Sequence, residues 1–324
     1  MKLTRRHTLK LTAAALAAPA FAHSALAQAW PTRTIRAVIP FAAGSTIDIV
    51  GRIVADPLSR QLGQSIVVEN RGGAGGTIGN GIVAKAEPDG YTILIDGAAH
   101  SATPAAYPNI PFDVVKDFAS VAAFGSVPNV LLVRPESGIK SVKELIAKAK
   151  AAELTYASAG VGSTTHWAAE RFRVSAGFKG IHVPFTGGPA ALTEVMTGRV
   201  DFTLMGMGSA LSFIEGRKLV PLAVSTPKRS RALPEVPTTL ELGLADSDYN
   251  FWLGMFVPAK TPRAIIDRLH AETQKVLKLP DVMEKFARQG IEPMPLSPTE
   301  FDALIAKEVE SNKAFVKAAG LKFN

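Results

Sequence analysis

The chain has 324 residues, no cysteine and a formal net charge of +8. The lack of cysteine excludes a disulfide framework and thiolate chemistry, so stability must come from buried cores, and the length suits two domains. The basic side chains are scattered and aromatic residues are sparse, a pattern that does not support nucleic-acid binding.

The first 27 residues have the three parts of an export signal: a basic start, a short apolar run and an A-x-A cleavage site before Gln28. The pair Arg5 and Arg6 resembles the signal of the twin-arginine pathway, and Sec export is the alternative. A membrane anchor is disfavoured because the run is short and contains Pro19. Removal of this segment takes away four positive and no negative charges, so the net charge falls from +8 to +4.

The first strand, turn and helix form a candidate anion site. Residues 33–38 have a strand pattern, and apolar residues recur at helical spacing over residues 49–62. Between them, Gly44 allows the turn and Ser45 or Thr46 can cap the helix. The free N–H groups and the dipole of a helix start attract a carboxylate or phosphate. The candidate ligand residues in this unit are Ala43, Gly44, Ser45, Thr46 and Asp48.

Asp48 and Pro57 have distinct expected roles in this first helix. Asp48 lies in the first turn, where a carboxylate favours the helix dipole, and the sequence leaves open whether it also orients a water molecule or an amine of the ligand. Pro57 is expected to kink or interrupt the helix, because it lacks an N–H and clashes with the carbonyl one turn back.

Residues 72–81 are rich in glycine but do not match a nucleotide-binding motif. No start within them places glycines at positions one, three and six, and the chain has no Gly-Lys dipeptide, so neither the dinucleotide fingerprint nor a P-loop is present. Close packing of the backbone is the expected role of these glycines, with Asn80 as a candidate ligand contact. The next strand, residues 91–95, leads into small and polar residues that include a further candidate, Ser101.

An uncharged stretch, residues 118–133, predicts two buried strands that pass through a hinge between two domains. Gly125 and Pro128 interrupt this stretch, so it is not a membrane span. The apolar strand 251–257 is the expected return crossing. We therefore expect a first domain of residues 28–126 and 249–324 and a second domain of residues 127–248.

Residues 154–166 repeat the pattern of strand, glycine turn and helix start. From residue 156 onward this stretch reads YASAGVGSTTH. Here Ser163 or Thr164 is the expected N-cap. A third unit of this kind covers residues 181–189, where Pro189 suits the first helical position. The candidate ligand residues in these two units and at the end of the following strand are Ser158, Gly160, Ser163, Thr164, Phe185, Thr186, Gly187 and Met205.

Successive β-α units of this kind predict an α/β fold with largely parallel, doubly wound sheets. Ligands of such sheets bind in the crevice at the carboxyl ends of the strands. Two such domains joined by two crossings therefore predict a ligand cleft between them.

Five segments of the chain carry a resemblance to a known family. They read PFAAGSTID, ENRGGAGGTIG, AEPDGYTIL, YASAGVGSTTH and HVPF. They are similar to segments of the solute-binding proteins of tripartite tricarboxylate transporters, the Bug or TctC family, and the resemblance covers nearly the whole mature chain. It matches residues 43–48 to the ligand loop of the first domain and residues 158–165 to the loop that faces it.

The resemblance implies a type II periplasmic-binding-protein fold, a periplasmic location and a monomer that closes on a small organic carboxylate. It implies membrane transporter subunits as partners, no enzymatic activity and no cofactor. Three departures concern the substrate. Ser45 stands where the family usually has glycine, Phe185 replaces a tyrosine, and residues 186–189 are one residue shorter than usual. If Phe185 and Met205 line the pocket, they favour an apolar body beyond the carboxylate.

Two alternatives have weaker support. A solute sensor that signals through a two-component system would share the same site, and the sequence does not separate it from transport. An exported hydrolase would use Ser163 with His166, or Ser101 with His100. No G-x-S-x-G elbow is present and no acid is placed to orient either histidine. The histidines also lack the spacing of paired metal ligands.

Overall fold

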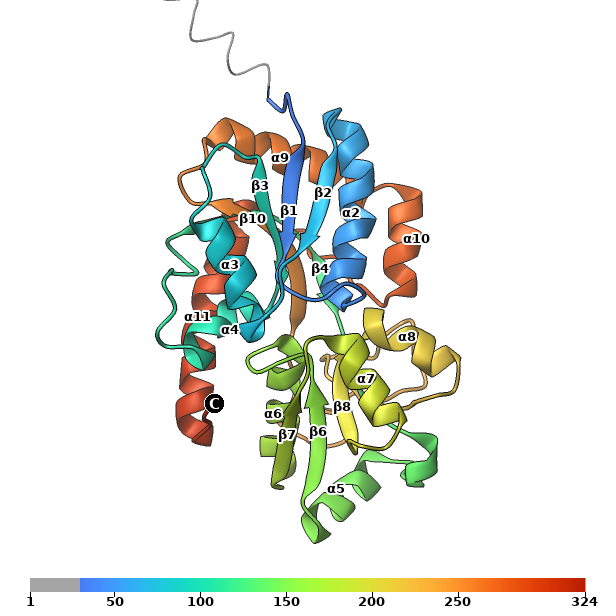
Figure 1. Cartoon of the computed structure of the whole chain (residues 1–324). Helices are drawn as coiled ribbons and strands as arrows, with labels where there is room; N and C mark the ends of the chain where they lie inside the picture. The colour runs from blue at the N-terminus through green and yellow to red at the C-terminus, as the bar shows by residue number, and fades with distance from the viewer. Residues whose placement is uncertain (1–29, 324) are drawn as a thin grey trace, which may run out of the picture.

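The computed structural model describes residues 30–323 and places them in two α/β lobes, each built on a five-stranded sheet. The first lobe is the upper one in Figure 1 and the second lobe is the lower one. The expected export signal and its cleavage site before Gln28 lie outside the described residues. In the part of the chain that is described, no helix has both the length and the apolar character needed to cross a membrane.

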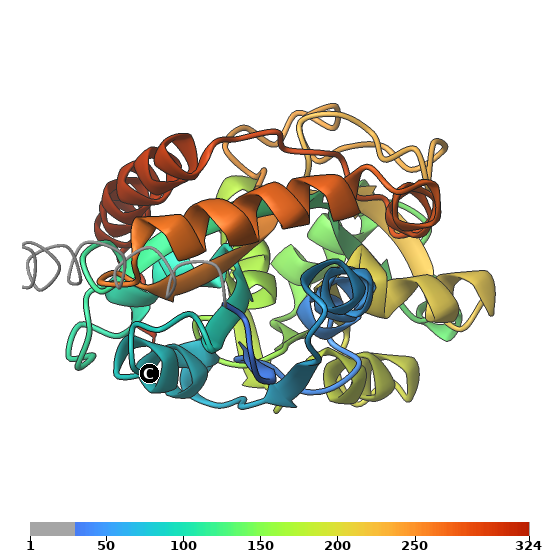
Figure 2. The ribbon, with the colours of Figure 1, turned by 90° about the horizontal axis from the view of Figure 1, so that it is seen from above.

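The sheet of the first lobe has the strand order β2-β1-β3-β10-β4. Its strands are β1 (Ile35–Ile39), β2 (Ile66–Asn70), β3 (Thr92–Gly97), β4 (Phe118–Val127) and β10 (Phe251–Pro258). The helices of this lobe are the short 3-10 helix η1 (Ala74–Gly76), α2 (Thr46–Leu62), α3 (Thr77–Ala84), α4 (Ala99–Ala106), α9 (Arg263–Leu277), α10 (Pro280–Arg288) and α11 (Pro298–Ala319). Viewed from above, α2, α9 and α10 cover one face of the sheet, and α3, α4 and α11 cover the other (Figure 2).

The sheet of the second lobe has the order β7-β6-β8-β5-β9. Its strands are β5 (Asn129–Val133), β6 (Leu154–Ser158), β7 (Gly180–Pro184), β8 (Phe202–Gly206) and β9 (Val220–Val224). Its helices are η2 (Pro135–Ser137), α5 (Val142–Ala151), α6 (Thr164–Ala176), α7 (Gly188–Met196) and α8 (Met207–Glu215). In both sheets three parallel strands are followed by one antiparallel strand, β10 or β5, and then by an outer strand. This shared order confirms the predicted fold class.

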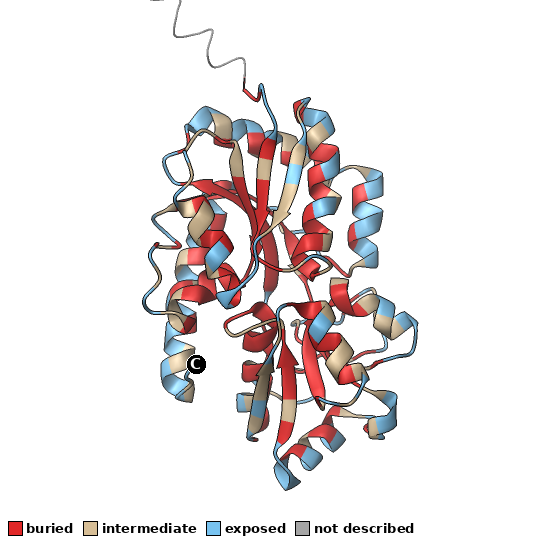
Figure 3. Cartoon of the chain, in the orientation of Figure 1, coloured by how far each residue is buried: buried red, intermediate tan, exposed pale blue. Residues whose placement is uncertain are grey.

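The crossing between the lobes occurs where the uncharged stretch predicts it. β4 belongs to the first sheet and β5 to the second, and Pro128 is the single residue between them. The chain returns to the first sheet at β10. Every residue of β5 and β10 is buried, which explains why these strands have continuous apolar sequences instead of an alternating pattern. Figure 3 shows buried residues concentrated in the central strands of both lobes.

The expected interruption of the first helix is wrong, because α2 continues through Pro57 from Thr46 to Leu62. Proline removes only one backbone donor from the helix, and Pro57 itself is buried together with Val54 and Leu58 on the face that packs against the core. The burial of this apolar face outweighs the local cost. The helix ends at Gly63 in the left-handed conformation.

Candidate ligand-binding site

A small cavity lies between the lobes, where several helices begin. Its volume is about 20 Å³, enough for one water-sized sphere, because the lobes are closed on each other. The first lobe supplies the start of α2 and the start of β10, and the second lobe supplies the starts of α6, α7 and α8. The cavity is lined by Phe41, Ser45, Thr46, Ile47, Ala159, Ser163, Thr164, Thr165, Gly188, Met205, Ser209 and Phe251.

The start of α2 is held in place by its own side chains. Ser45 Oγ accepts a hydrogen bond from the N–H of Asp48 at 3.3 Å, as the sequence predicts for an N-cap. The Asp48 carboxylate accepts hydrogen bonds from Gly44 N, Arg52 Nε and Asn70 Nδ2, each at 2.9 Å. Asp48 therefore fixes the turn before the helix, while the N–H groups of the first turn have no intrahelical acceptor.

The start of α6 repeats this arrangement in the second lobe. Ser163 Oγ accepts from the N–H of His166 at 3.3 Å, which confirms the second predicted N-cap. Thr165 Oγ1 accepts from Ala159 N at 2.8 Å and so holds the preceding loop. Thr164 Oγ1 is buried and has no hydrogen-bond partner among the described protein atoms. It is therefore available to a ligand.

Direct hydrogen bonds join the two lobes beside the cavity. Thr46 Oγ1 accepts from Ser209 N at 3.2 Å, and Ser209 Oγ donates to the carbonyl of Gly44 at 3.2 Å. Gly187 also permits this close approach, since an added Cβ would lie 2.7 Å from the Cβ of Ala42. The helix starts of α2 and α6 thus face one closed space, where their dipoles favour an anion.

The structure brings five of the predicted ligand residues to the wall of the cavity: Ser45, Thr46, Ser163, Thr164 and Met205. Gly44 contacts the opposite lobe through its carbonyl. Ala43 and Thr186 are exposed, and Phe185 is half-buried, so none of these three lines the cavity in the closed form. Gly160 lies close to the carbonyl of Phe185, where an added Cβ would be 3.4 Å from the oxygen.

Three other predicted residues make hydrogen bonds away from the cavity. Asn80 Nδ2 donates to Asp96 Oδ2 at 2.8 Å, and burial raises the pKa of Asp96 to about 7. Ser101 Oγ lies within hydrogen-bond distance of the Ala98 carbonyl, at 2.9 Å, and of the Glu308 carboxylate, at 2.8 Å. Ser158 Oγ lies 2.6 Å from His182 Nε2. These contacts stabilise the elements around the cleft.

Seven residues that line the cavity were not among the individual candidate ligand residues: Phe41, Ile47, Ala159, Thr165, Gly188, Ser209 and Phe251. Two of them, Ala159 and Thr165, do lie in the loop 158–165 that the family resemblance indicates. Ser209 had a detectable signal, because residues 206–209 are small residues between a strand and a helix, the same pattern that marks the other helix starts. Phe251 had none, since it enters the cavity from the return crossing.

Neither serine–histidine pair has the geometry of a hydrolase. Ser163 Oγ accepts from the backbone N–H of His166, while the ring nitrogen Nδ1 of His166 accepts from Gly162 N at 3.1 Å. His100 lies against Asn80 and the Val114 carbonyl, with no contact to Ser101 Oγ. Within residues 30–323, no three His, Asp or Glu side chains are grouped to hold a metal ion.

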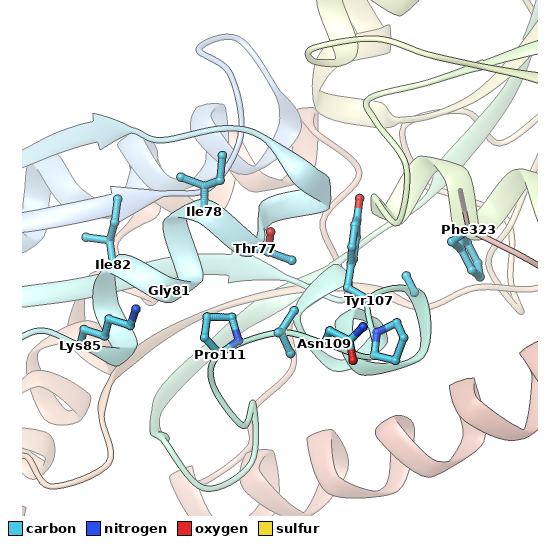
Figure 4. Close-up of a pocket in the computed structure, with 12 residues that line it drawn as sticks. Thr77, Ile78, Gly81, Ile82, Lys85, Tyr107, Asn109, Pro111 and Phe323 are labelled. Atoms are coloured by element: carbon cyan, nitrogen blue, oxygen red, sulfur yellow. The ribbon is translucent and has the colours of Figure 1, made fainter.

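A larger hollow of about 700 Å³ lies on the first lobe, outside the cleft, between α3 and the segment that follows α4 (Figure 4). Tyr107 forms part of its wall and points toward the second lobe. Its hydroxyl donates to the carbonyl of Val161 at 2.9 Å, just before the start of α6. This hydrogen bond is another link between the lobes.

Solved structures of similar proteins share the fold of this chain. The periplasmic binding protein BugD is 30% identical, with 90% of this chain and 99% of that chain covered and a TM-score of 0.86. The Rhodopseudomonas palustris protein Rpa4515, solved with adipate, is 32% identical, with 90% and 99% covered and a TM-score of 0.87. MatC from the same organism, with bound malate, is 30% identical, with 89% and 100% covered and a TM-score of 0.84.

Two α/β lobes with this topology, closed on a cleft where helix starts converge, define a periplasmic type of solute-binding protein. Residues 50–321 match the family described as the tripartite tricarboxylate transporter family receptor, TctC. The chain belongs to this family, which confirms the resemblance found in its sequence.

Proposed function

We propose that this protein is a periplasmic receptor that closes on a small organic dicarboxylate and delivers it to the membrane subunits of a tripartite tricarboxylate-type transporter. One observation carries the proposal. The starts of α2 and α6 meet in a closed space that also contains the unpartnered hydroxyl of Thr164. Backbone N–H groups and hydroxyls at helix starts suit a carboxylate that must be released again, because each hydrogen bond from an uncharged donor contributes only about 1–2 kcal/mol net.

The ligands of two similar proteins support the choice of a dicarboxylate. Adipate and malate are both aliphatic dicarboxylates, and both were found in chains that match nearly the whole length of this one. The family to which the chain belongs supports the transporter as its partner. Because both sides of the cleft come from one chain, a monomer is sufficient for binding, and no chemical step on the ligand is required.

Domain closure is the motion that the proposal needs. We propose that residues 127–248 move as one domain relative to residues 28–126 and 249–324. The single residue between β4 and β5, Pro128, and the segment before β10 would be the hinges. The hydrogen bonds between Ser209 and the first lobe are then contacts of the closed form.

Calorimetric titration with malate, succinate and adipate tests the proposal. At least one of these acids should bind the wild-type protein, and Thr164→Val should weaken its binding by about tenfold, since one hydrogen bond of roughly 1.4 kcal/mol is lost. Thr273→Val is the matched control, because Thr273 Oγ1 is also buried and unpartnered but lies on α9, away from the cleft.

The control variant should bind the acid as the wild type does. The proposal is wrong if no dicarboxylate binds, or if Thr164→Val binds as tightly as Thr273→Val. Turnover of ester or amide substrates by the wild type, lost on Ser163→Ala, would instead support the hydrolase alternative.

A further inference from the structure

We propose that Asn129, Ser225 and Trp167 form a second polar subsite of the cleft, which accepts an oxygen atom at the far end of the ligand. The inference rests on the proposed function, since it concerns the other end of the same dicarboxylate. These three residues then distinguish a diacid from a monoacid of equal chain length.

The first observation is a group of buried polar side chains without partners. The Asn129 amide, Ser225 Oγ and Trp167 Nε1 have no hydrogen-bond partner among the described protein atoms. The three residues are 0% exposed. The hydroxyl of Thr164, which lines the cavity, is also buried without a hydrogen-bond partner. Buried polar groups are nearly always paired in folded proteins, so several unpaired ones in one region point to a ligand.

Strand register places Asn129 at the edge of the sheet that faces the cleft. Asn129 begins β5 and is paired with Gly206, the last residue of β8. Paired residues of antiparallel strands face the same side of the sheet. An added Cβ on Gly206 would lie 2.5 Å from Thr46 Oγ1 and 2.8 Å from Phe251, and both of these residues line the cavity. Asn129, Ser225 and Trp167 do not themselves line the closed cavity, but the side chain of Asn129 lies on the same side of the sheet as Gly206, which contacts two of its lining residues.

Ser225 lies next to Asn129, and Trp167 is linked to them through Tyr249. The N–H of Ser225 donates to the Asn129 carbonyl at 2.9 Å, and the Ser225 carbonyl accepts from Tyr249 N at 2.9 Å. The ring of Tyr249 is stacked on Trp167, with 6.5 Å between centroids. Trp167 is one turn after Thr164 on α6, and helical side chains lean toward the helix start, which here is the cleft.

The chemistry of these groups defines what can occupy the subsite. The indole N–H of Trp167 can only donate, so the occupant must accept a hydrogen bond. Asn129 Nδ2 and the Ser225 hydroxyl add further donors, Asn129 Oδ1 is an unpartnered acceptor, and none of the three side chains is charged. A carboxylate, hydroxyl or carbonyl oxygen can accept from the donors of this set, which an ammonium group cannot do.

Asn129→Leu tests the subsite, because leucine has nearly the shape of asparagine without its amide. The probes are the tightest-binding member of the diacid series from malonate to adipate and the monoacid with the same number of carbons. The preference for the diacid should fall about tenfold in Asn129→Leu. The melting temperature of the ligand-free protein should stay equal or rise, since an unpaired buried amide is replaced by an apolar group.

Ser225→Ala should lower the same preference by a smaller factor. Ser120→Ala is its matched control, because Ser120 Oγ is also buried and unpartnered but lies on β4, away from the cavity. If the wild type binds no acid of the panel, the proposed function and the subsite fail together. If the wild type binds but Asn129→Leu keeps the preference, or weakens both acids equally with a lower melting temperature, only the subsite is wrong.

Discussion

His166 holds the loop 158–165 in place through contacts on the side away from the cavity. Its Nδ1 accepts from Gly162 N, and its ring is stacked on His182 with 3.7 Å between centroids. His182 Nε2 in turn lies 2.6 Å from Ser158 Oγ, at the other end of the loop. Burial lowers the pKa of His166 to about 2, with further contributions from His182 and Arg173, and burial lowers the pKa of His182 to about 4. Both imidazoles are therefore neutral supports of the loop.

His166→Asn should change the pH dependence of stability. Asparagine retains an acceptor near the position of Nδ1 but does not titrate. The folded pKa of His166, about 2, is below its unfolded value of about 6.5, so its contribution to stability is complete above pH 6.5 and is lost as the pH falls toward 2. The stability advantage of the wild type over the variant should shrink by about 1.4 kcal/mol per pH unit below pH ~6. Urea denaturation of both proteins at pH 7, 6 and 5 measures this stability difference. A difference that stays constant with pH would contradict the prediction.

Residues that act through local geometry were predictable, and residues that act through the fold were not. The sequence limited each N-cap to two neighbouring residues, Ser45 or Thr46 and Ser163 or Thr164, and the serine is the cap in both helices, because a cap depends only on the next three residues. Asn129 and Phe251 begin strands at the two crossings, and nothing in their own sequence shows that they face the cleft. Their positions follow from strand register, which a single sequence does not contain.

At the scale of elements, the same local motif has different roles in different helices. Ser163 caps α6 at the cleft, and Ser297 caps α11, where Glu300 completes a capping box on the outer part of the first lobe. Both serines accept from the N–H three residues ahead at 3.3 Å. A comparison of the two caps separates helix stability from ligand binding.

Ser163→Ala and Ser297→Ala should each lower the free energy of unfolding by about 1 kcal/mol, since each removes one cap hydrogen bond. Only Ser163→Ala should also weaken dicarboxylate binding, by roughly threefold, because the first turn of α6 is then less well ordered before the ligand binds. Urea denaturation and calorimetric titration of both variants measure the two effects. If Ser163→Ala binds the dicarboxylate as tightly as Ser297→Ala does, the Ser163 cap contributes only to helix stability.

The type and boundaries of an element could be predicted where glycine and proline mark its ends. Errors arose where tertiary packing determines whether an element continues. The predicted strands on either side of Pro128 are present as β4 and β5, because glycine, proline and uncharged apolar residues specify buried strands. The break expected at Pro57 is absent because the buried face of α2 holds the helix together. Local propensity predicts the cost of a proline but not the tertiary contacts that compensate for it.

At the scale of the whole molecule, Gly75 of the glycine-rich stretch lies at a contact between the lobes, whereas the other glycines of residues 72–81 pack within the first lobe. An added Cβ on Gly75 would lie 2.4 Å from the carbonyl oxygen of Val161, and one on Gly162 would lie 2.7 Å from the ring of Tyr107. The sequence predicted close backbone packing here without identifying the partner, since the partner is on the other lobe. Tyr107, Gly75 and Gly162 thus form a contact between the lobes at the edge of the cleft.

Tyr107→Phe should make the closed form easier to open. The variant loses the hydrogen bond to Val161 but keeps the ring and its packing, and the loss of about 1 kcal/mol should raise the dissociation rate of the bound acid by roughly fivefold. Tyr91→Phe is the matched control, because the Tyr91 hydroxyl accepts from Thr32 N within the first lobe. Stopped-flow measurement of ligand release compares the two variants. Since a hydroxyl within one lobe does not resist opening, equal release rates in the two variants would show that Tyr107 does not hold the lobes together.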